Sequence, residues 1–363
     1  MIQTVFLYVF ALLISFLLAK KARVSGKNRY IVFLILILTL LPGLRAISVG
    51  LDTQRYNYFF ELIKNGEFDY VWGVEYTYKM MMLLFSKVSK SFTIFILLIA
   101  LLTNMCIILR FWDYRDIAKF EWVVAAYYVT FYFYQMNIMR QMCAVALVFF
   151  GSRYIVKGRY GLFLLFVAAG YLFHTSAVLG VLFFASEYLN WNGLSKRKKQ
   201  FLGLTALLAP VAVLYVARKL STYLRYFTRF QFQIGAVLPI KLGLLLLGQW
   251  GLKQTVIHRR EMVREKKCQS DSMEIRYRIT MVEICYAVGL LICFAGYIIP
   301  YADRISLYFY IYECVYVGII MKYKPVRSGY PIVIALWYGL IFISIFFGVG
   351  QGQIPYLFFW QQG

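Results

Sequence analysis

The chain has 363 residues, of which 62% are hydrophobic and 19% aromatic, and its mean hydropathy is +0.67. Soluble globular domains hold about 45–50% apolar residues, so this composition excludes an ordinary soluble protein. The net charge of +23 does not indicate nucleic-acid binding, because Lys and Arg occur in short runs between apolar stretches and form no continuous basic face.

Apolar stretches follow one another along almost the whole chain. The first, Met1 to Leu18, ends at Lys20 and Lys21, where a signal peptide would have a small-residue cleavage site. We therefore expect it to be a retained helix. A crossing takes about 20 apolar residues, and shorter helices can thin the bilayer. The sequence predicts an all-α polytopic membrane protein, a single transmembrane domain over 1–363, with about twelve spans at 3–19, 30–44, 91–109, 121–135, 141–156, 161–173, 175–189, 201–217, 236–256, 279–298, 305–321 and 330–348.

Basic residues lie mostly in alternate loops, and this predicts the topology. With the N-terminus outside, the loops predicted to be cytoplasmic hold about twice as many Lys and Arg residues as the external side. Short cytoplasmic loops carry such an excess, so inverting every helix would oppose the rule. The loops concerned are 20–29, 110–119, 153–159, 196–199, 259–278 and 322–327.

Two external segments are predicted to lie at the membrane surface. The loop 45–90 contains an apolar stretch, 76–89, which we expect to be re-entrant or interfacial, since counting it as a thirteenth span would put its neighbours on opposite faces. The segment 218–235 is basic and aromatic and is predicted to be an amphipathic helix that holds lipid headgroups. The Tyr and Phe run at 127–134 favours an aromatic belt over a platform for stacking sugars.

Polar residues that a membrane protein should avoid gather on the predicted external side. Arginines from separate helices suit a multiply anionic ligand, because the guanidinium group donates bidentate hydrogen bonds to phosphate oxygens. A lipid diphosphate at the membrane surface is the predicted ligand. The residues are Arg45, Asp52, Arg55, Tyr56, Glu75, Asn137, Arg140, Gln141, His174, Asp303 and Arg304.

His174 or Asp52 could take a proton from an acceptor hydroxyl, since a histidine titrates near neutral pH. Structural alternatives stay open for each residue. A helix-end arginine can be an anchor that reaches the headgroups, and His174 can be a structural hydrogen-bonding group. Asp52 and Glu75 can be loop caps or ion-pair partners.

Two short motifs resemble a known family. The segment 137–144, NIMRQMCA, resembles the NxxRQxxA turn of the EpsG/Wzy-like polysaccharide polymerases, and 173–177, FHTSA, resembles their FHxSA turn about thirty residues later. The segment 50–56, GLDTQRY, is similar to the family's early external loop, and Asp303, Arg304 and Tyr308 fit the pattern of a late helix. Where the family often has Glu-Pro-Gly, this chain keeps only Glu75.

The resemblance implies a GT-C-like, integral-membrane glycosyltransferase in the bacterial inner membrane, with its active site on the periplasmic or external side. It implies that polyprenyl-diphosphate-linked oligosaccharide is both donor and acceptor, and that the configuration of the linkage inverts. It also implies that no metal or other cofactor is obligatory. The implied partners are membrane lipids and a chain-length regulator protein. Arg45, Arg55, Arg140 and Arg304 would bind the leaving diphosphate, and His174 or Asp52 would deprotonate the acceptor.

Other functions remain as alternatives. A flippase or transporter of the lipid-linked glycan would need charged residues along the midplane, where Lys241 and Glu313 are the main exceptions to an apolar pattern. A membrane O-acyltransferase would also use a histidine, reached from the cytoplasmic side. The sequence contains no phosphate-binding loop, HExxH or GxSxG motif, and a second external histidine for a metal site is lacking because His258 lies in a basic loop.

Overall fold

The structure is a computed structural model, and it describes residues 2–193, 269–295, 302–323 and 352–361, with short pieces between 196 and 200, at 243 and between 332 and 342. The described residues form helices and turns, and no β-strand occurs among them. The predicted spans 201–217 and 236–256, the segment 218–235 and most of 330–348 lie outside the described residues.

Several helices are long and apolar enough to cross a membrane. Within the described residues these are α1 (Ile2–Ser25), α5 (Phe92–Trp112) and the part 277–294 of α13 (Gln269–Ala295). A fourth span would be the pair α14 (Ala302–Tyr310) and α15 (Tyr312–Tyr323), which is bent by 42°. The structure thus confirms an all-helical protein with apolar helices, whereas it does not confirm the predicted number of about twelve spans.

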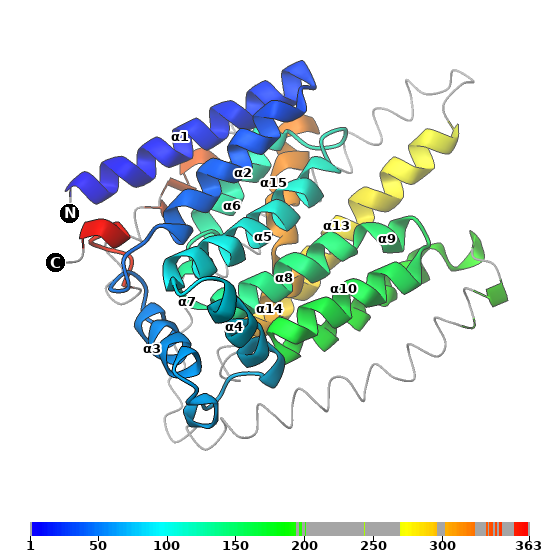
Figure 1. Cartoon of the computed structure of the whole chain (residues 1–363). Coiled ribbons are helices and arrows are strands. Elements are labelled where there is room, and N and C mark those ends of the chain that lie inside the picture. The colour runs from blue at the N-terminus through cyan, green and yellow to red at the C-terminus, as the bar shows by residue number, and fades with distance from the viewer. Residues whose placement is uncertain are drawn as a thin grey trace.

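Shorter helices complete the described bundle. They are α2 (Asn28–Gly43), α6 (Phe120–Thr130), α7 (Tyr134–Asn137), α8 (Met139–Gly151), α9 (Arg153–Val156), α10 (Tyr160–Phe173) and the 3₁₀ segment η2 (Thr175–Gly193). Helix α1 packs on α2 and α6, and α8 packs on α5 and α10 (Figure 1). Two helices of the loop between α2 and α5, α3 (Thr53–Lys64) and α4 (Tyr76–Val88), lie across one end of this bundle, which we call the α3 end (Figure 1).

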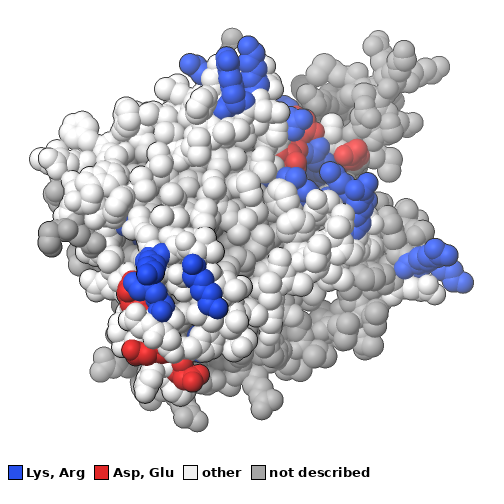
Figure 2. Space-filling model, in the orientation of Figure 1, with Lys and Arg blue, Asp and Glu red and all other residues white. Residues whose placement is uncertain are grey.

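Described basic residues from several segments meet at the opposite end, which we call the α9 end. The Arg23 guanidinium at the end of α1 pairs with Glu121 at the start of α6, at 2.7 Å. Arg153 of α9 pairs with Asp113 after α5, at 2.9 Å. Figure 2 shows charged side chains in separate groups at the two ends of this face, with a broad band without charge between them. Such a band is what a bilayer requires of a protein surface.

A buried polar cluster joins α2, α5, α6 and α7 inside the bundle. The Asn104 amide of α5 is fully buried and donates to the Leu38 carbonyl at 3.1 Å and to Gln135 Oε1 at 2.9 Å. The Tyr127 hydroxyl donates to Asn104 Oδ1 at 3.1 Å. Between apolar helices in lipid, such hydrogen bonds and close packing hold the bundle together. A Cβ atom on Gly289 would lie 2.5 Å from the backbone nitrogen of Tyr310, so α13 and α14 cross in close contact.

The segment 352–361 returns to the α3 end and holds the loop before α3. The Gly50 amide donates to the Gly352 carbonyl at 2.6 Å, and the Ala46 amide donates to the Leu357 carbonyl at 2.8 Å. The Gln353 side chain is 2% exposed and donates to the Phe133 carbonyl, at 3.2 Å. The hydropathy pattern did not predict this contact, which connects residues about 300 positions apart.

Candidate active site

Arg140, in the first turn of α8, is the centre of a polar cluster at the α3 end. Its Nε donates to the Tyr56 hydroxyl of α3 at 3.0 Å, its Nη1 pairs with the Glu75 carboxylate, and its Nη2 donates to the Gly73 carbonyl at 3.4 Å. The guanidinium carbon lies 5.6 Å from the Tyr56 ring centroid and 5.7 Å from that of Tyr78. These contacts use three of the five N–H groups of an arginine.

Glu75 lies just before α4 and connects Arg140 to the turn after α10. It occupies the cap position of α4, but its side chain makes no capping hydrogen bond. One carboxylate oxygen pairs with Arg140, and the other accepts a hydrogen bond from the Thr175 amide at 3.3 Å. The side chains of Glu75 and Arg140 are each 14% exposed. The pair is therefore partly desolvated, which strengthens its attraction relative to a surface ion pair.

Arg55 brings a second guanidinium group to the same loop. Its side chain is exposed, and its guanidinium carbon lies 5.1 Å from the Phe59 ring centroid. A Cβ atom on Gly73 would lie 3.6 Å from Arg55 Nη2. Gly73 has φ +70°, a conformation that glycine adopts without strain. Because Arg140 binds its carbonyl oxygen, Gly73 lies between the two cationic groups.

Asp52 precedes α3 and lies one helical turn before Tyr56. Its side chain is half-buried and does not cap the helix by a hydrogen bond. Residues four positions apart lie on the same helix face, so Asp52 lies on the face of α3 that presents Tyr56 to Arg140. This face is the part of the predicted external loop that reaches the cluster.

His174 belongs to a chain of hydrogen bonds that ends in α14. Its ring Nδ1 lies 2.6 Å from Ser176 Oγ, and it accepts a hydrogen bond from the Ser176 amide at 3.3 Å. The Ser176 hydroxyl in turn lies 2.9 Å from the fully buried Tyr308 hydroxyl. The Thr175 amide between them binds Glu75. The His174 turn and the Arg140 cluster therefore share one carboxylate.

Arg45 lies inside the protein beside this cluster. It is 2% exposed, its Nε donates to Thr53 Oγ1 at 3.1 Å, and its other nitrogens donate to the carbonyl groups of Pro42 and Met136. Burial lowers its pKa to about 10, since the charged form loses hydration. The group stays charged at neutral pH and joins the end of α2 to the turn before α8. That it also binds substrate stays a prediction.

The side chains of Asn137 and Gln141 bind backbone groups of neighbouring segments, and Gln141 contacts Arg304 in this way. Asn137 Oδ1 accepts a hydrogen bond from the Leu51 amide at 2.9 Å, next to Asp52. Gln141 is buried and donates to the Arg304 carbonyl at 2.9 Å. The Arg304 side chain itself is exposed. All four arginines predicted to bind diphosphate thus belong to the α3 end, although only Arg55 and Arg140 flank the same loop.

Some residues of the cluster were not predicted from the sequence. Ser176 stands in the FHTSA motif, which was the signal for it, but its role appears only through its contacts with His174 and Tyr308. Gly73 and Tyr78 contact Arg140 without any local motif. Within the part of the chain that the structure describes, no group of at least three His, Cys, Asp or Glu side chains is placed to hold a metal ion.

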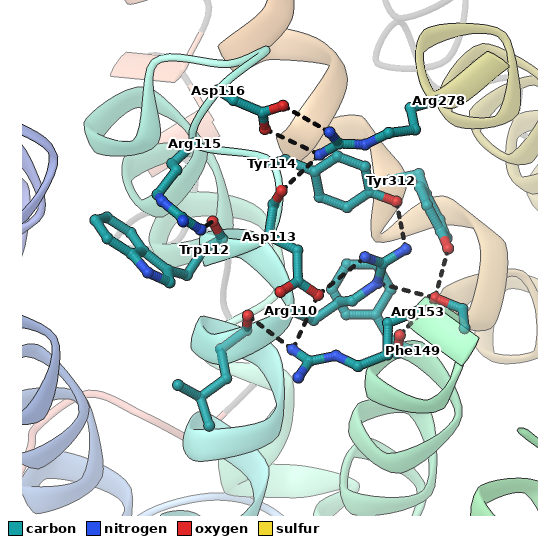
Figure 3. A network of polar contacts seen from close by, with 12 residues as sticks. Arg110, Trp112, Asp113, Tyr114, Arg115, Asp116, Phe149, Arg153, Arg278 and Tyr312 are labelled. Carbon is teal, nitrogen blue, oxygen red and sulfur yellow. Dashed lines mark hydrogen bonds and ion pairs between the residues drawn. The ribbon is translucent and has the colours of Figure 1, made fainter. Parts of the chain in front are cut away.

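A second arginine cluster lies at the α9 end (Figure 3). Arg110 of α5 donates to Ser152 Oγ at 3.0 Å, to Asp113 at 3.1 Å and to the Tyr114 hydroxyl at 2.6 Å. Arg278 of α13 pairs with Asp116 at 2.6 Å. Burial raises the pKa of Tyr114 above its ordinary value, despite the opposing effect of the Arg110 charge. The cluster connects α5, α8 and α13 through the turn that follows α5.

The described fold and the α3-end cluster define an all-helical, multi-pass membrane protein with arginine, tyrosine and carboxylate side chains converging at one end of the bundle. The chain belongs to the EpsG family, whose model matches residues 28–358, nearly the whole chain. Membership in this family indicates a membrane-bound polysaccharide polymerase, an enzyme of the glycosyltransferase type. Comparisons with curated proteins and with solved structures gave no match.

Proposed function

We propose that this protein polymerises polyprenyl-diphosphate-linked oligosaccharide repeat units into a surface polysaccharide, on the external face of the bacterial inner membrane. A hydroxyl group of one lipid-linked unit attacks the anomeric carbon of the chain on a second lipid carrier. The bond to the diphosphate breaks, and the configuration at the anomeric carbon inverts. The observation that carries this proposal is Arg140, held at the meeting point of α3, the Gly73 loop and the start of α8.

Arg140 and Arg55 are the proposed diphosphate-binding groups. The contacts of Arg140 with the described residues use three of its five N–H groups, and the exposed Arg55 guanidinium also lies beside Gly73. Arg140 also lies in the first turn of α8, where the helix dipole adds positive potential. Negative charge grows on the leaving diphosphate in the transition state, so groups already oriented toward it lower the barrier.

In this proposal Asp52 or His174 deprotonates the hydroxyl group of the acceptor. Arg304 adds positive charge beside Gln141. Arg45 has a positioning role in this proposal, because its donors already bind Thr53, Pro42 and Met136. It holds the loop that carries Asp52 against the turn that carries Arg140.

The charge distribution supports the external location. At the α9 end, four arginines at or near helix ends contact carboxylates: Arg23, Arg110, Arg153 and Arg278. The excess of basic residues in cytoplasmic loops would place the α9 end in the cytoplasm and the α3 end outside. Cysteine accessibility measured in intact cells tests this: a cysteine at exposed Tyr58 should react with an impermeant reagent, and one at exposed Lys157 should not.

Glycan gel analysis of a deletion strain tests the function itself. The expected result is that a ladder of chain lengths collapses to one repeat unit, and that a plasmid copy of the wild-type gene restores the ladder. A flippase would instead leave lipid-linked units on the cytoplasmic side, and an O-acyltransferase would leave the ladder intact with acyl groups missing. Either of these results would contradict the proposal.

A further inference from the structure

The loop between α3 and α4 presents two aromatic rings to the outside at the α3 end. Tyr70 is 70% exposed and Trp72 is 75% exposed, whereas Val71 between them is 3% exposed. The backbone at Val71 is extended, with φ −90° and ψ 109°. Side chains alternate along an extended chain. The two rings therefore lie on the same side of the loop, opposite the buried Val71.

Helix α4 holds this loop in place. The Lys79 ammonium group donates to the Phe68 carbonyl at 3.2 Å and to the Val71 carbonyl at 3.1 Å. It also lies 4.3 Å from the Phe68 ring centroid, and the Phe68 and Tyr76 ring centroids are 5.6 Å apart. These contacts fix the backbone on both sides of Tyr70. A ligand of the two exposed rings therefore does not have to order the loop when it binds.

Acidic residues in the same loop distinguish it from a membrane anchor. Anchors at the bilayer surface combine aromatic with basic residues, which anionic headgroups attract. Between 65 and 76 the chain has Glu67, Asp69 and Glu75 and no Lys or Arg. Glu67 and Asp69 are exposed, and Figure 2 shows acidic side chains at this end of the molecule.

Aromatic rings beside carboxylates suit a sugar as the ligand. The face of an aromatic ring is negative and attracts the positively polarised C–H groups of a sugar ring. A carboxylate accepts hydrogen bonds from hydroxyl groups. A sugar offers both kinds of group, whereas an anionic headgroup would be repelled by Glu67 and Asp69.

The two rings lie next to the proposed diphosphate-binding arginines. Trp72 is bonded to Gly73, whose carbonyl accepts from Arg140 Nη2 at 3.4 Å. A Cβ atom on Gly73 would lie 3.6 Å from Arg55 Nη2. Consecutive Cα atoms are only about 3.8 Å apart. The first sugar of the lipid-linked donor is bonded to the phosphate itself, so a diphosphate held beside Gly73 brings this sugar within reach of the Trp72 ring.

We infer that Tyr70 and Trp72 form a platform on which the sugars next to the diphosphate of the lipid-linked donor stack. The exposed carboxylates of Glu67 and Asp69 accept hydrogen bonds from the sugar hydroxyl groups. The inference rests on the proposed function and names the part of the substrate that this loop recognises. Stacking is present both in the bound substrate and in the transition state. Loss of the platform should therefore raise KM and leave kcat unchanged.

Steady-state kinetics of the purified full-length protein in detergent test the inference. The substrate is the lipid-linked repeat unit extracted from the deletion strain. Trp72→Ala should raise KM about tenfold and change kcat by less than about threefold. Trp72→Phe keeps a ring and should have a KM between those of the wild type and Trp72→Ala. Because the assay contains no bilayer, the loss of a membrane anchor would not raise KM.

Trp360→Ala is the matched control. Trp360 is 58% exposed and lies in the segment 352–361, which also returns to the α3 end. Its described ring contacts are with Phe358 and Phe359, at 4.4 and 4.9 Å between centroids. The control should keep the KM and kcat of the wild type. Both tryptophans are exposed, so thermal unfolding of either variant in detergent should resemble that of the wild type.

Saturation-transfer NMR measures sugar binding without catalysis. The probe is oligosaccharide prepared by partial acid hydrolysis of the strain's own surface polysaccharide. Its C–H protons should receive magnetisation from the wild-type protein, and the transfer should fall at least about threefold in Trp72→Ala.

The outcomes distinguish the inference from the proposed function. An unchanged KM in Trp72→Ala, or a fall in kcat alone, would overturn the inference and leave the polymerase function standing. Equal rises of KM in Trp72→Ala and Trp360→Ala would do the same, as would equal saturation transfer from the wild type and Trp72→Ala. If the deletion strain still makes the ladder, the proposed function fails, and the saturation transfer alone then decides whether this loop binds sugar.

Discussion

The two ends of the helical bundle both hold arginines against tyrosine rings and carboxylates, but they are assembled from different parts of the chain. At the α9 end Arg110 has a side chain only 4% exposed, and its partners connect membrane helices to one another. At the α3 end Arg140 is 14% exposed, and Tyr56, Gly73 and Glu75, its partners, come from the loop between α2 and α5.

We infer from this difference that a cluster of arginines alone does not mark the proposed active site. At the α9 end Asp113 and Asp116 bind the arginines, and the described cluster contains no histidine. The α3 end adds His174 and its serine and tyrosine partners. We therefore expect substitutions at the α9 end to change stability and those at the α3 end to change polymerisation.

The largest expected effect is that of Arg110→Ala. Removing this buried arginine leaves Asp113, Ser152 and Tyr114 without its hydrogen bonds, and the loss of one partner of a buried charged network costs about 3–5 kcal/mol of folding free energy. Thermal unfolding in detergent measures it. The control is Arg115→Ala, an exposed neighbour in Figure 3, which should change stability by less than about 0.5 kcal/mol. Equal stability of the two variants would show that the network is dispensable.

Arg140→Lys comes next and affects activity. A lysine cannot bind Tyr56, Gly73 and Glu75 together, because its three N–H groups share one nitrogen, whereas Arg140 reaches these partners through three separate nitrogens. Polymer yield should fall about 10²–10³-fold, nearly as far as in Arg140→Ala. Arg278→Lys makes the same exchange at the α9 end and should leave chain length unchanged. A full-length ladder from Arg140→Lys would contradict the assigned role of Arg140.

Glu75→Gln tests whether the carboxylate holds Arg140 in place. The substitution keeps the size of the side chain but removes the charge, and a charge-assisted hydrogen bond contributes about 1.5–3 kcal/mol. We expect polymer yield to fall roughly 10- to 100-fold, at a normal level of protein. Glu61→Gln is the matched control, because among the described residues Glu61 pairs with Lys64 in a partly exposed ion pair, which contributes little. Equal ladders from both variants would remove Glu75 from the site.

Tyr308→Phe should have the smallest effect. It removes one neutral hydrogen bond, to Ser176, which contributes about 1 kcal/mol and hence about a fivefold change in polymer yield. Tyr312→Phe is the control, since the Tyr312 hydroxyl donates to Ser152 at 2.9 Å at the α9 end. The control should lower stability slightly and leave chain length as in the wild type. The reverse pattern would mean that the comparison of the two ends is wrong.

The helical segments near the site could be predicted because hydropathy is a local property. Helices α2, α5 and α10 coincide with predicted spans within a few residues, and the loop 45–90 contains α3 and α4 as separate helices. The number of spans could not be confirmed in this way. Helices such as α6 and α8 are 11 and 13 residues long, shorter than the apolar stretches from which they were predicted.

The site could be predicted only in part. Arg140 and His174 stand in helix-end turns that a sequence pattern marks. Arg45 carries the same signal, but the structure places it in the interior, bound to Thr53 and Met136. Glu75 had the weakest motif support among the predicted residues, yet it contacts Arg140 directly. A pattern identifies a polar residue at a helix end, but not the direction of its side chain.

The sequence by itself determined that this is a helical membrane protein, because backbone groups in lipid must bond within each helix and apolar length alone marks a span. It also determined which turns carry the charged residues. Only the tertiary structure decided that Glu75 meets Arg140, that Ser176 joins His174 to Tyr308, and that the segment 352–361 holds the loop before α3. These contacts join segments far apart in the chain, and they depend on how the helices pack.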